Sequence, residues 1–198
     1  DILNYLKSKK IEVQKISILE KSDYFIKEVK KKIPSAEVFD DLDNIKINPE
    51  MTTFIYSNEF FDVFGSKQYI YQNKKFNEIK ITKINNEYKL VYEENLISAY
   101  LKNRYSNYDF EEKDILEHSI FIDNLILQIK EKLNKNFFFS TTDYGYLKLP
   151  RKSTLRLISN HRKVDLFEEF ENIDYSFSVN FEYLKDNFKT FKPKVISQ

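Results

Sequence analysis

The sequence predicts an α/β fold in which helices cover a mainly parallel sheet that carries an antiparallel, β-rich insertion. Near the N-terminus, apolar strand-like runs alternate with helical patterns, as in parallel sheets covered by helices. In the middle of the chain, strand-like runs follow one another with short links, which is typical of antiparallel hairpins. Beyond them, a long amphipathic pattern leads into the apolar run FFFSTT.

The first part of the chain is expected to contribute two helices and three strands. They are a helix over 1–9, a strand over 12–19, a helix over 22–33, a short strand over 36–39 and a buried strand over 53–57. Ser22 is a suitable N-cap for the second helix. Pro34 ends that helix, because proline has no N–H to continue the hydrogen-bond ladder.

The middle part is expected to form the insertion, over residues 66–115, so that residues 1–65 and 116–198 make up a partial core. The insertion contains strands over 68–72, 76–82 and 87–92 and a helix near 94–103. Asn85-Asn86 predicts a tight hairpin between the last two of these strands, because asparagine tolerates a positive φ.

The last part returns to the sheet and its helices. The expected elements are a long amphipathic helix over 117–134, strands over 137–145, 154–159 and 175–181, and a final helix that begins near the end of the last strand. Residues 137–139, FFF, are interpreted as the core of a strand buried on both faces. His118 is placed on the flank of the long helix, without a functional role.

The composition excludes several classes of protein. The 32 basic and 31 acidic side chains give a net charge of +1, so nothing favours a nucleic-acid partner. No apolar window of about 18 uncharged residues predicts a membrane span. The chain has no cysteine and two histidines, which predicts no metal site and fits a cytoplasmic protein. Its two glycines cannot build a glycine-rich phosphate loop.

Acidic residues stand where three of the predicted strands end. They are Glu20, Glu59 with Asp62, and Asp143. Ligands bind beyond the carboxyl ends of the strands in sheets of this kind, and an acid there can hold ribose hydroxyls. The same carboxylates could instead cap the helices or turns that follow. The pattern by itself leaves both interpretations open.

Taken in order, these segments resemble the MidA family of S-adenosylmethionine-dependent methyltransferases. The similar segments are ISILEKSDYFIKEVKKKI, TFIYSNEFFDVFGSKQYIY, FFFSTTDYG, STLRLISNH and DYSFSVNFEYL, and NEFFD after a strand is the most specific of them. The resemblance implies a Rossmann-like class I methyltransferase sheet with S-adenosylmethionine as the cofactor. Because mitochondrial members methylate an arginine of a respiratory-complex subunit, it also implies a protein substrate, with arginine as the acceptor.

The resemblance assigns roles to individual residues. Glu20 would bind the ribose of the methyl donor. Asn58, Glu59 and Asp62 would lie beside the donor as the catalytic group, and Asn58 would also contact the donor. The implied supporting positions, near the substrate or in the structure around it, are Asp143, Arg156, His161, Asp174 and Ser176.

The sequence departs from the family pattern at positions that would affect donor binding, activity and a contact with the substrate. The glycine-rich donor loop is missing, so we expect the 198 residues to be the middle of a longer protein, with an incomplete sheet and no activity by themselves. Either additional chain or another copy supplies the strand expected in the centre of the sheet, or the strand order differs. Ser178 and Asn180 replace acidic positions, which would alter a contact with the substrate.

Carboxylates suit the implied reaction, because they bind a guanidinium through two hydrogen bonds and fix its plane. Methyl transfer itself depends mainly on alignment of the reacting groups. We therefore expect Glu59 to orient the acceptor or the donor, with Asp62 in support. The alternative is that Asn58 and Asp62 only cap and complete a turn.

Two supporting residues have open roles. His161 could accept a proton, orient Asp143 or be structural, and Arg156 could pair with Asp143 or Asp174. For the whole protein, the alternative function is a catalytically degenerate methyltransferase fold that acts as a scaffold or assembly factor, since the donor loop is missing. A nucleic-acid or small-molecule methyltransferase lacks the expected basic stripe or [DN]PPY motif.

Overall fold

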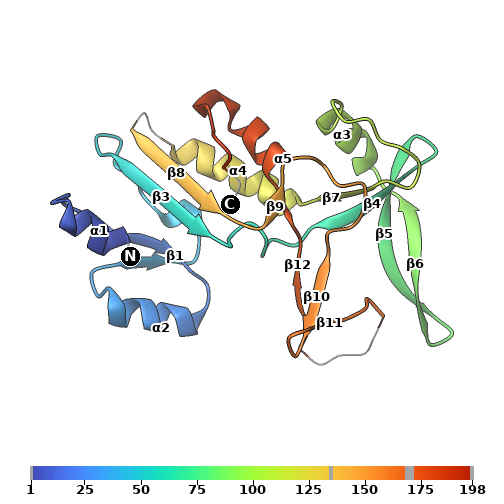
Figure 1. The fold of residues 1–198 in the computed structure, drawn as a ribbon, viewed down its shortest axis with the longest axis horizontal. Coiled ribbons are helices and arrows are strands. Elements are labelled where there is room, and N and C mark those ends of the chain that lie inside the picture. The colour runs from blue at the N-terminus through green and yellow to red at the C-terminus, as the bar shows by residue number, and fades with distance from the viewer. Residues whose placement is uncertain (1, 134–135, 168–171, 197–198) are drawn as a thin grey trace. The chain divides into compact units, whose positions relative to one another are not determined.

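A computed structural model of the chain describes residues 2–133, 136–167 and 172–196 (Figure 1). The chain divides into two compact units. The first consists of residues 1–54 and 127–138, and the second of residues 55–126 and 139–198. Of the residues that the sequence singles out for a site, Glu20 belongs to the first unit and all the others belong to the second.

The first unit begins with the helix α1 (Ile2–Ser8), and a β-α-β segment made of β1 (Ser17–Leu19), α2 (Asp23–Lys32) and β2 (Glu37–Phe39) follows it. The 3-10 helix η1 (Leu42–Asn44) comes next. β1 and β2 pair in parallel, with Ile18 opposite Val38. Ser22 caps α2 as predicted, and its Oγ accepts the N–H of Phe25 at 3.5 Å. β1 is shorter than predicted, because its partner β2 has only three residues.

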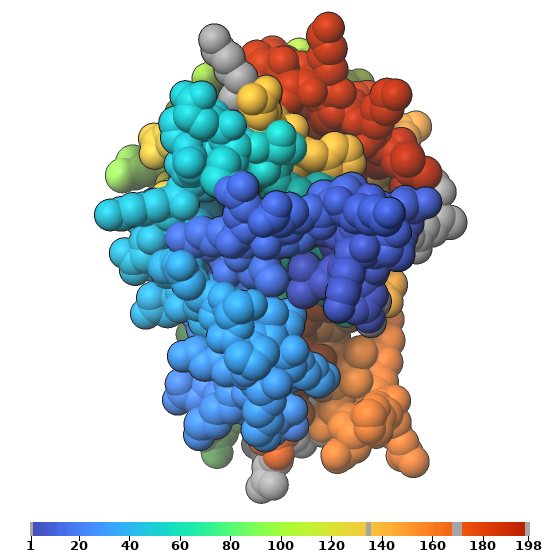
Figure 2. Space-filling model, turned by 90° about the vertical axis from the view of Figure 1, so that its left-hand side faces the viewer, coloured from blue at the N-terminus to red at the C-terminus, as the bar shows by residue number. Residues whose placement is uncertain are grey.

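An open groove lies within the first unit, between residues 3–16 and residues 32–35, on the face seen in Figure 2. Its volume is about 520 Å³, and apolar and lysine side chains form most of its lining. None of the predicted site residues lines this groove.

The strands β3 (Thr53–Asn58) and β8 (Phe137–Thr142) form a two-stranded sheet. They run in parallel (Figure 1), since the N–H of Thr53 bonds to the carbonyl of Asn136 and the N–H of Glu59 to that of Thr142. The predictions of a buried strand over 53–57 and of burial on both faces at 137–139 are wrong. Phe54 is 50% exposed and Phe138 57%, because one face of the pair is left uncovered by the described residues.

The second unit contains a four-stranded antiparallel sheet in the order β6-β5-β4-β7. Its strands are β4 (Lys67–Gln72), β5 (Lys75–Ile84), β6 (Glu87–Glu94) and β7 (Ile115–His118). The three strands predicted over 68–72, 76–82 and 87–92 are therefore present. Asn85 and Asn86 form the predicted hairpin turn, with φ angles of 51° and 66°.

The helix α3 (Ile97–Arg104) packs on this sheet and closes its core. The Oγ of Ser98 on α3 accepts the N–H of Phe76 on β5 at 2.9 Å. Phe76, Leu101 and Leu116 are fully buried. Burying large apolar side chains of this kind contributes about 1.5–3 kcal/mol each.

The helix predicted over 117–134 begins later, as α4 (Ile120–Lys132). Residues 117 and 118 belong to β7, because that strand pairs with β4 as far as the position where Lys67 lies opposite His118. Ser119 separates strand from helix, and its Oγ accepts the N–H of Ile122 at 3.4 Å and donates to the carbonyl of Gly65 at 2.8 Å. The placement of His118 on the flank of a helix is therefore wrong, because the residue ends a strand.

The C-terminal part of the second unit is made of short strands and one helix. They are β9 (Gly145–Tyr146), β10 (Arg156–Ser159), β11 (Arg162–Lys163), β12 (Asp174–Ser176), β13 (Val179–Asn180), α5 (Phe181–Asn187) and the 3-10 helix η2 (Lys189–Phe191). β11, β10 and β12 form an antiparallel sheet, and β13 pairs in parallel with β9. The single strand predicted over 175–181 is thus split in two. No helix of the described chain is long and apolar enough to cross a membrane.

Candidate functional site

The turn that follows β3 is held by the carboxylate of Asp143, which follows β8. Its Oδ2 accepts the backbone N–H groups of Phe60 at 3.1 Å, Phe61 at 2.8 Å and Asp62 at 3.4 Å. Its Oδ1 accepts the N–H of Tyr144 at 2.8 Å. Hydrogen bonds to a carboxylate are stronger than neutral ones. Asp143 therefore fixes the backbone of the NEFFD segment at the carboxyl end of the parallel strand pair.

Glu59 has an unusual backbone conformation at the start of this turn. Its φ is 46°, in the left-handed region that residues other than glycine, asparagine and aspartate rarely adopt. Its N–H bonds to the carbonyl of Thr142 at 2.8 Å, which ties the strained residue to β8. The side chains of Asn58 and Glu59 are both exposed. Strain of this kind clusters at functional sites, and the exposed side chain of Glu59 is accessible from solvent.

Asp62 lies half-buried in the same turn, among other acidic groups. Its Oδ1 is buried and has no hydrogen-bond partner among the described residues. Burial raises the pKa of the Asp62 carboxyl, and the negative charges of Asp143, Glu59 and Asp174 raise it further. A cationic ligand at this edge of the strand pair would relieve that repulsion.

Gly145 follows the Asp143 turn at a point where two backbones come close together. It pairs with Val179 across β9 and β13. A Cβ at this position would lie 2.2 Å from the carbonyl oxygen of Val179 and 2.6 Å from the ring of Phe181. The residue after Asp143-Tyr144 must therefore be glycine for β13 to approach β9 this closely.

The structure does not bring all the predicted supporting residues to the turn. His161 is exposed at the tip of the β10–β11 hairpin, with a φ of 60°, and no hydrogen bond between described residues links it to Asp143. Arg156 makes no ion pair with Asp143 or Asp174. Its Nη2 donates to Ser178 Oγ at 3.3 Å, and its guanidinium carbon lies 5.9 Å from the centre of the Tyr144 ring.

Asp174 and Ser176 both lie on β12, which pairs with β10. Asp174 stands opposite Ile158 and is exposed, and Ser176 stands opposite Arg156 and is half-buried. Only Asp174 influences the turn directly, through its charge on Asp62. Of the two departures from the family pattern, Asn180 caps α5 by accepting the N–H of Tyr183 at 2.9 Å, and Ser178 donates its N–H to Thr154 Oγ1 at 3.0 Å.

Glu20, in the first unit, caps the start of α2, which is one of the two roles that the sequence left open for it. Its Oε1 accepts the N–H groups of Lys21 and Ser22, both at 2.8 Å, at the start of α2. Its own N–H continues the parallel pairing by bonding to the carbonyl of Phe39 at 2.9 Å. The side chain is half-buried at the carboxyl end of β1. This position is the one from which an acid can reach ribose hydroxyls.

A buried network around His118 was missed by the sequence interpretation. His118 is 3% exposed, and its Nδ1 lies 3.1 Å from the hydroxyl of Tyr105. Its Nε2 lies 3.1 Å from Asp123 Oδ2, without the alignment of a hydrogen bond. Tyr100 donates to Asp123 at 2.6 Å, and Tyr183 also donates to Asp123. This network links β7, α3, α4 and α5.

The pKa of Asp123 reflects this network. Burial by itself would raise it, but the nearby His118 ring and the hydrogen bonds from Tyr100 and Tyr183 outweigh burial and lower it. Burial and the bond to Asp123 raise the pKa of Tyr100 to about 12. A clue to the network exists in the sequence, because one of only two histidines stands five residues before an aspartate. The helical assignment of residue 118 hid it.

The described residues hold no group of three histidine, cysteine or acidic side chains that could bind a metal ion. The turn at 59–62 is suited instead to an organic cation. It offers exposed Glu59, partly buried Asp62 and a rigid backbone held by Asp143. These features define an α/β protein with an acidic site at the end of a parallel strand pair.

The chain belongs to the family described as "Putative S-adenosyl-L-methionine-dependent methyltransferase", whose model matches residues 1–194. The cofactor of that family, S-adenosylmethionine, is the one that the sequence predicted. The positive sulfonium of this cofactor fits the acidic surroundings of the turn. The narrower resemblance to the MidA family stays a prediction.

Two solved structures from Burkholderia thailandensis share the fold. One, an uncharacterized protein, has a TM-score of 0.74, and the other, bound to S-adenosyl-homocysteine, has a TM-score of 0.73. Each is 16% identical to this chain and covers 96% of it. The chain spans about half the length of these proteins, 53% of the first and 51% of the second. No curated protein sequence matches this chain.

Proposed function

We propose that the protein is an S-adenosylmethionine-dependent methyltransferase that methylates an arginine of a protein substrate. The observation that supports it most is the turn after β3, where Asp143 fixes the backbone and a strained residue presents the carboxylate of Glu59. Family membership supports the methyl donor. The arginine acceptor, in a respiratory-complex subunit, rests on the resemblance to the MidA family.

When bound, S-adenosylmethionine supplies a methyl group on a positively charged sulfur. A nitrogen of the acceptor donates its lone pair to the methyl carbon, the carbon–sulfur bond breaks, and S-adenosylhomocysteine leaves with the electron pair of that bond. The product nitrogen then loses a proton to solvent. The protein contributes alignment of the reacting groups, which can be worth several kcal/mol, up to about 7–11.

Glu59 and Asp62 would provide that alignment on the acceptor side. A carboxylate that accepts two N–H bonds from a guanidinium fixes its plane and keeps positive charge away from the attacking nitrogen. Glu59 is exposed and held by its backbone bond to β8, so its side chain can swing onto a ligand without unfolding the turn. Asp62 would hold the second edge of the guanidinium, and Asn58 would contact the donor.

Glu20 is proposed to bind the ribose of the donor. Its Oε1 already accepts two backbone N–H groups at the start of α2, which fixes the carboxylate. The carboxylate can accept further hydrogen bonds from the two ribose hydroxyls. We also propose that residues 66–115 form the lobe that meets the substrate, with 1–65 and 116–198 as a partial, Rossmann-like core, and that the protein acts in the cytoplasm.

The test separates this function from that of a scaffold. Calorimetry on the full-length protein should detect S-adenosylhomocysteine binding, and mass spectrometry of arginine peptides should detect a gain of one methyl group. Glu59→Gln should lower the rate at least about 100-fold while the protein stays folded. Glu131→Gln, which changes an exposed glutamate on α4 outside the proposed substrate lobe, is the control and should act as wild type.

Each failure has its own meaning. Without binding of S-adenosylhomocysteine, the enzyme proposal is wrong and the scaffold alternative stands. With binding but an unchanged rate for Glu59→Gln, the role of Glu59 is wrong and the donor assignment survives.

A further inference from the structure

Glu117 differs from the other buried acids of the described chain because no cation pairs with it. Among the residues that the structure describes, three acids are buried: Glu78 is 5% exposed, Asp114 7% and Glu117 8%. Lys67 lies 2.7 Å from Glu78, and Arg151 lies 2.9 Å from Asp114. None of the ion pairs among the described residues involves Glu117. A buried charge is costly unless it is paired, so its negative charge remains available to a cation.

Neutral donors hold the Glu117 carboxylate in place but do not occupy all the acceptor sites of its Oε2. Its Oε1 accepts the side chain of Gln68 at 2.8 Å, Ser153 Oγ at 3.2 Å and the N–H of Thr154 at 2.9 Å. Its Oε2 accepts the Thr154 hydroxyl. Each oxygen of a carboxylate offers about two acceptor sites, so the three donors at Oε1 share its sites, whereas Oε2 accepts a single donor. Oε2 therefore has room for another donor, in an orientation that the other bonds have already fixed.

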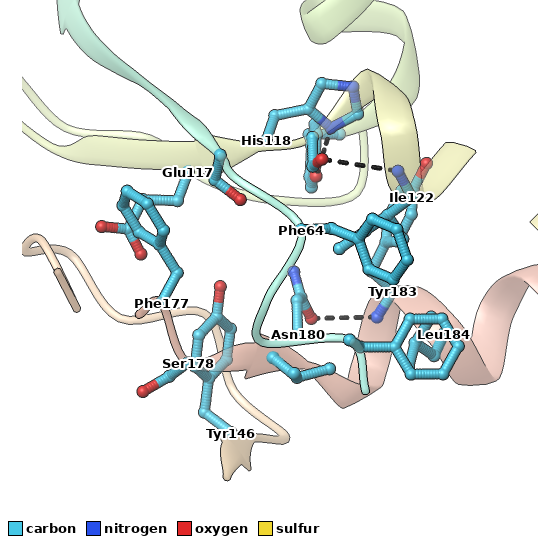
Figure 3. A pocket seen from close by; sticks show the side chains of 15 residues that line it. Phe64, Glu117, His118, Ile122, Tyr146, Phe177, Ser178, Asn180, Tyr183 and Leu184 are labelled. Carbon is cyan, nitrogen blue, oxygen red and sulfur yellow. Dashed lines mark hydrogen bonds between the residues drawn. The ribbon is translucent and has the colours of Figure 1, made fainter. Parts of the chain in front are cut away.

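Glu117 borders a small, partly open cavity with aromatic walls. The rings that line it belong to Phe61, Phe64, Tyr105, Tyr146, Phe177 and Tyr183. Figure 3 shows the Tyr146 phenol and the Asn180 amide pointing into this space. Burial and then the charge of Glu117 raise the pKa of Tyr146, so that charge is felt across the cavity. Asn180 Nδ2 is buried there without a partner among the described residues.

The size of the cavity limits what can enter. Its volume is about 30 Å³, which is room for about two water molecules. A whole residue cannot fit, but the tip of a side chain can. Asn180 Nδ2 is a donor, so a water molecule beside that tip would satisfy it.

We propose that this cavity binds the tip of a cationic side chain, an ammonium or one edge of a guanidinium, from the protein substrate. The cation would donate to Glu117 Oε2 through a charge-assisted hydrogen bond and lie against the faces of the aromatic rings. The inference rests on the proposed function only in taking the substrate to be a protein. Phe61 connects the cavity to the site, since it follows Phe60 in the turn that Asp143 holds.

The test uses small cations on the full-length protein without any methyl donor. Ethylammonium and ethylguanidinium are the probes, and ethylurea is the neutral control that has the shape of ethylguanidinium. At saturating concentration, at least one cation should raise the unfolding midpoint by about 2 °C, and ethylurea should not. Glu117→Gln should abolish the rise. Glu78→Gln, which neutralises a buried acid that already has a cation, should keep it.

The outcomes are separable from those of the methyltransferase test. An equal rise in Glu117→Gln, or no rise for either cation in the wild type, overturns the inference whatever S-adenosylhomocysteine binding shows. Should Glu117→Gln fail to fold, a crystal structure of the wild type soaked with ethylguanidinium decides. Density within hydrogen-bond distance of Glu117 Oε2 supports the site, and an empty cavity contradicts it.

Discussion

The carboxylate of Asp143 accepts the backbone N–H of Phe61 at 2.8 Å, so that a residue after β8 fixes the turn after β3. Three successive N–H groups point at the same Oδ2. This arrangement is a backbone nest closed by the protein's own anion. Asp143 therefore has a structural role, because its carboxylate fixes the backbone of the segment that carries Glu59 and Asp62.

We expect Asp143→Ala to destabilise the protein and to loosen the site. The change leaves the three turn N–H groups without their charged acceptor, which should cost about 1.5–3 kcal/mol of the free energy of unfolding. Urea denaturation measures that loss, and calorimetry should show weaker S-adenosylhomocysteine binding in the full-length protein. Asp174→Ala, which removes a neighbouring acid that makes no such bonds, is the matched control. Equal stability of Asp143→Ala and wild type would contradict this role.

The raised pKa of Asp62 predicts how stability depends on pH. Because the folded pKa lies above the unfolded value of 3.8, the folded state binds the proton more tightly than the unfolded state. Asp62 therefore destabilises the protein at neutral pH, and this penalty disappears as the pH falls below 3.8. Asp62→Asn should raise the free energy of unfolding at pH 7, by less than about 1 kcal/mol because the group is only partly buried. The gain should vanish in acid, and a gain that persists there would refute the explanation.

Local signals in the sequence predicted local structure well. Ser22 before α2 and Asn85-Asn86 between β5 and β6 were read correctly, because a cap and a tight turn depend on neighbouring residues. The acids at the ends of β3 and β8 could be named from the sequence. Their different roles could not be predicted, since Asp143 accepts backbone hydrogen bonds from residues more than 80 positions away.

Non-local pairing explains what the sequence interpretation missed. Residues 117 and 118 were assigned to the long helix, but pairing with β4 draws them into the sheet, where His118 is buried. The same pairing places Gln68 opposite Glu117, where it donates to the carboxylate. Propensity is a weak guide wherever tertiary contacts compete with it. The buried network and the unpaired acid therefore became visible only in the folded chain.

Asp123 should have the opposite pH dependence to Asp62. Its folded pKa is lowered, so its charged form stabilises the protein above its unfolded pKa, and this contribution is lost as the pH falls through the folded pKa. Asp123→Asn should lower the free energy of unfolding by about 3 kcal/mol at pH 7, because His118, Tyr100 and Tyr183 lose a charged partner. Denaturation at a series of pH values measures the difference from wild type. It should shrink in strong acid, and a difference independent of pH would argue against a charged Asp123.

The two glycines of the chain should respond differently to the same substitution. A Cβ at Gly145 would lie 2.2 Å from the carbonyl oxygen of Val179, whereas a Cβ at Gly65 would meet nothing within 4 Å. Gly145→Ala must push β13 away from β9, and we expect it to cost about 1–3 kcal/mol, the range for overpacked sites. Gly65→Ala should leave stability within about 0.5 kcal/mol of wild type. Thermal unfolding of the two variants makes the comparison. Because Gly145 follows Asp143-Tyr144, Gly145→Ala should also weaken S-adenosylhomocysteine binding. If Gly145→Ala is as stable as Gly65→Ala, the close approach of β9 and β13 is not required.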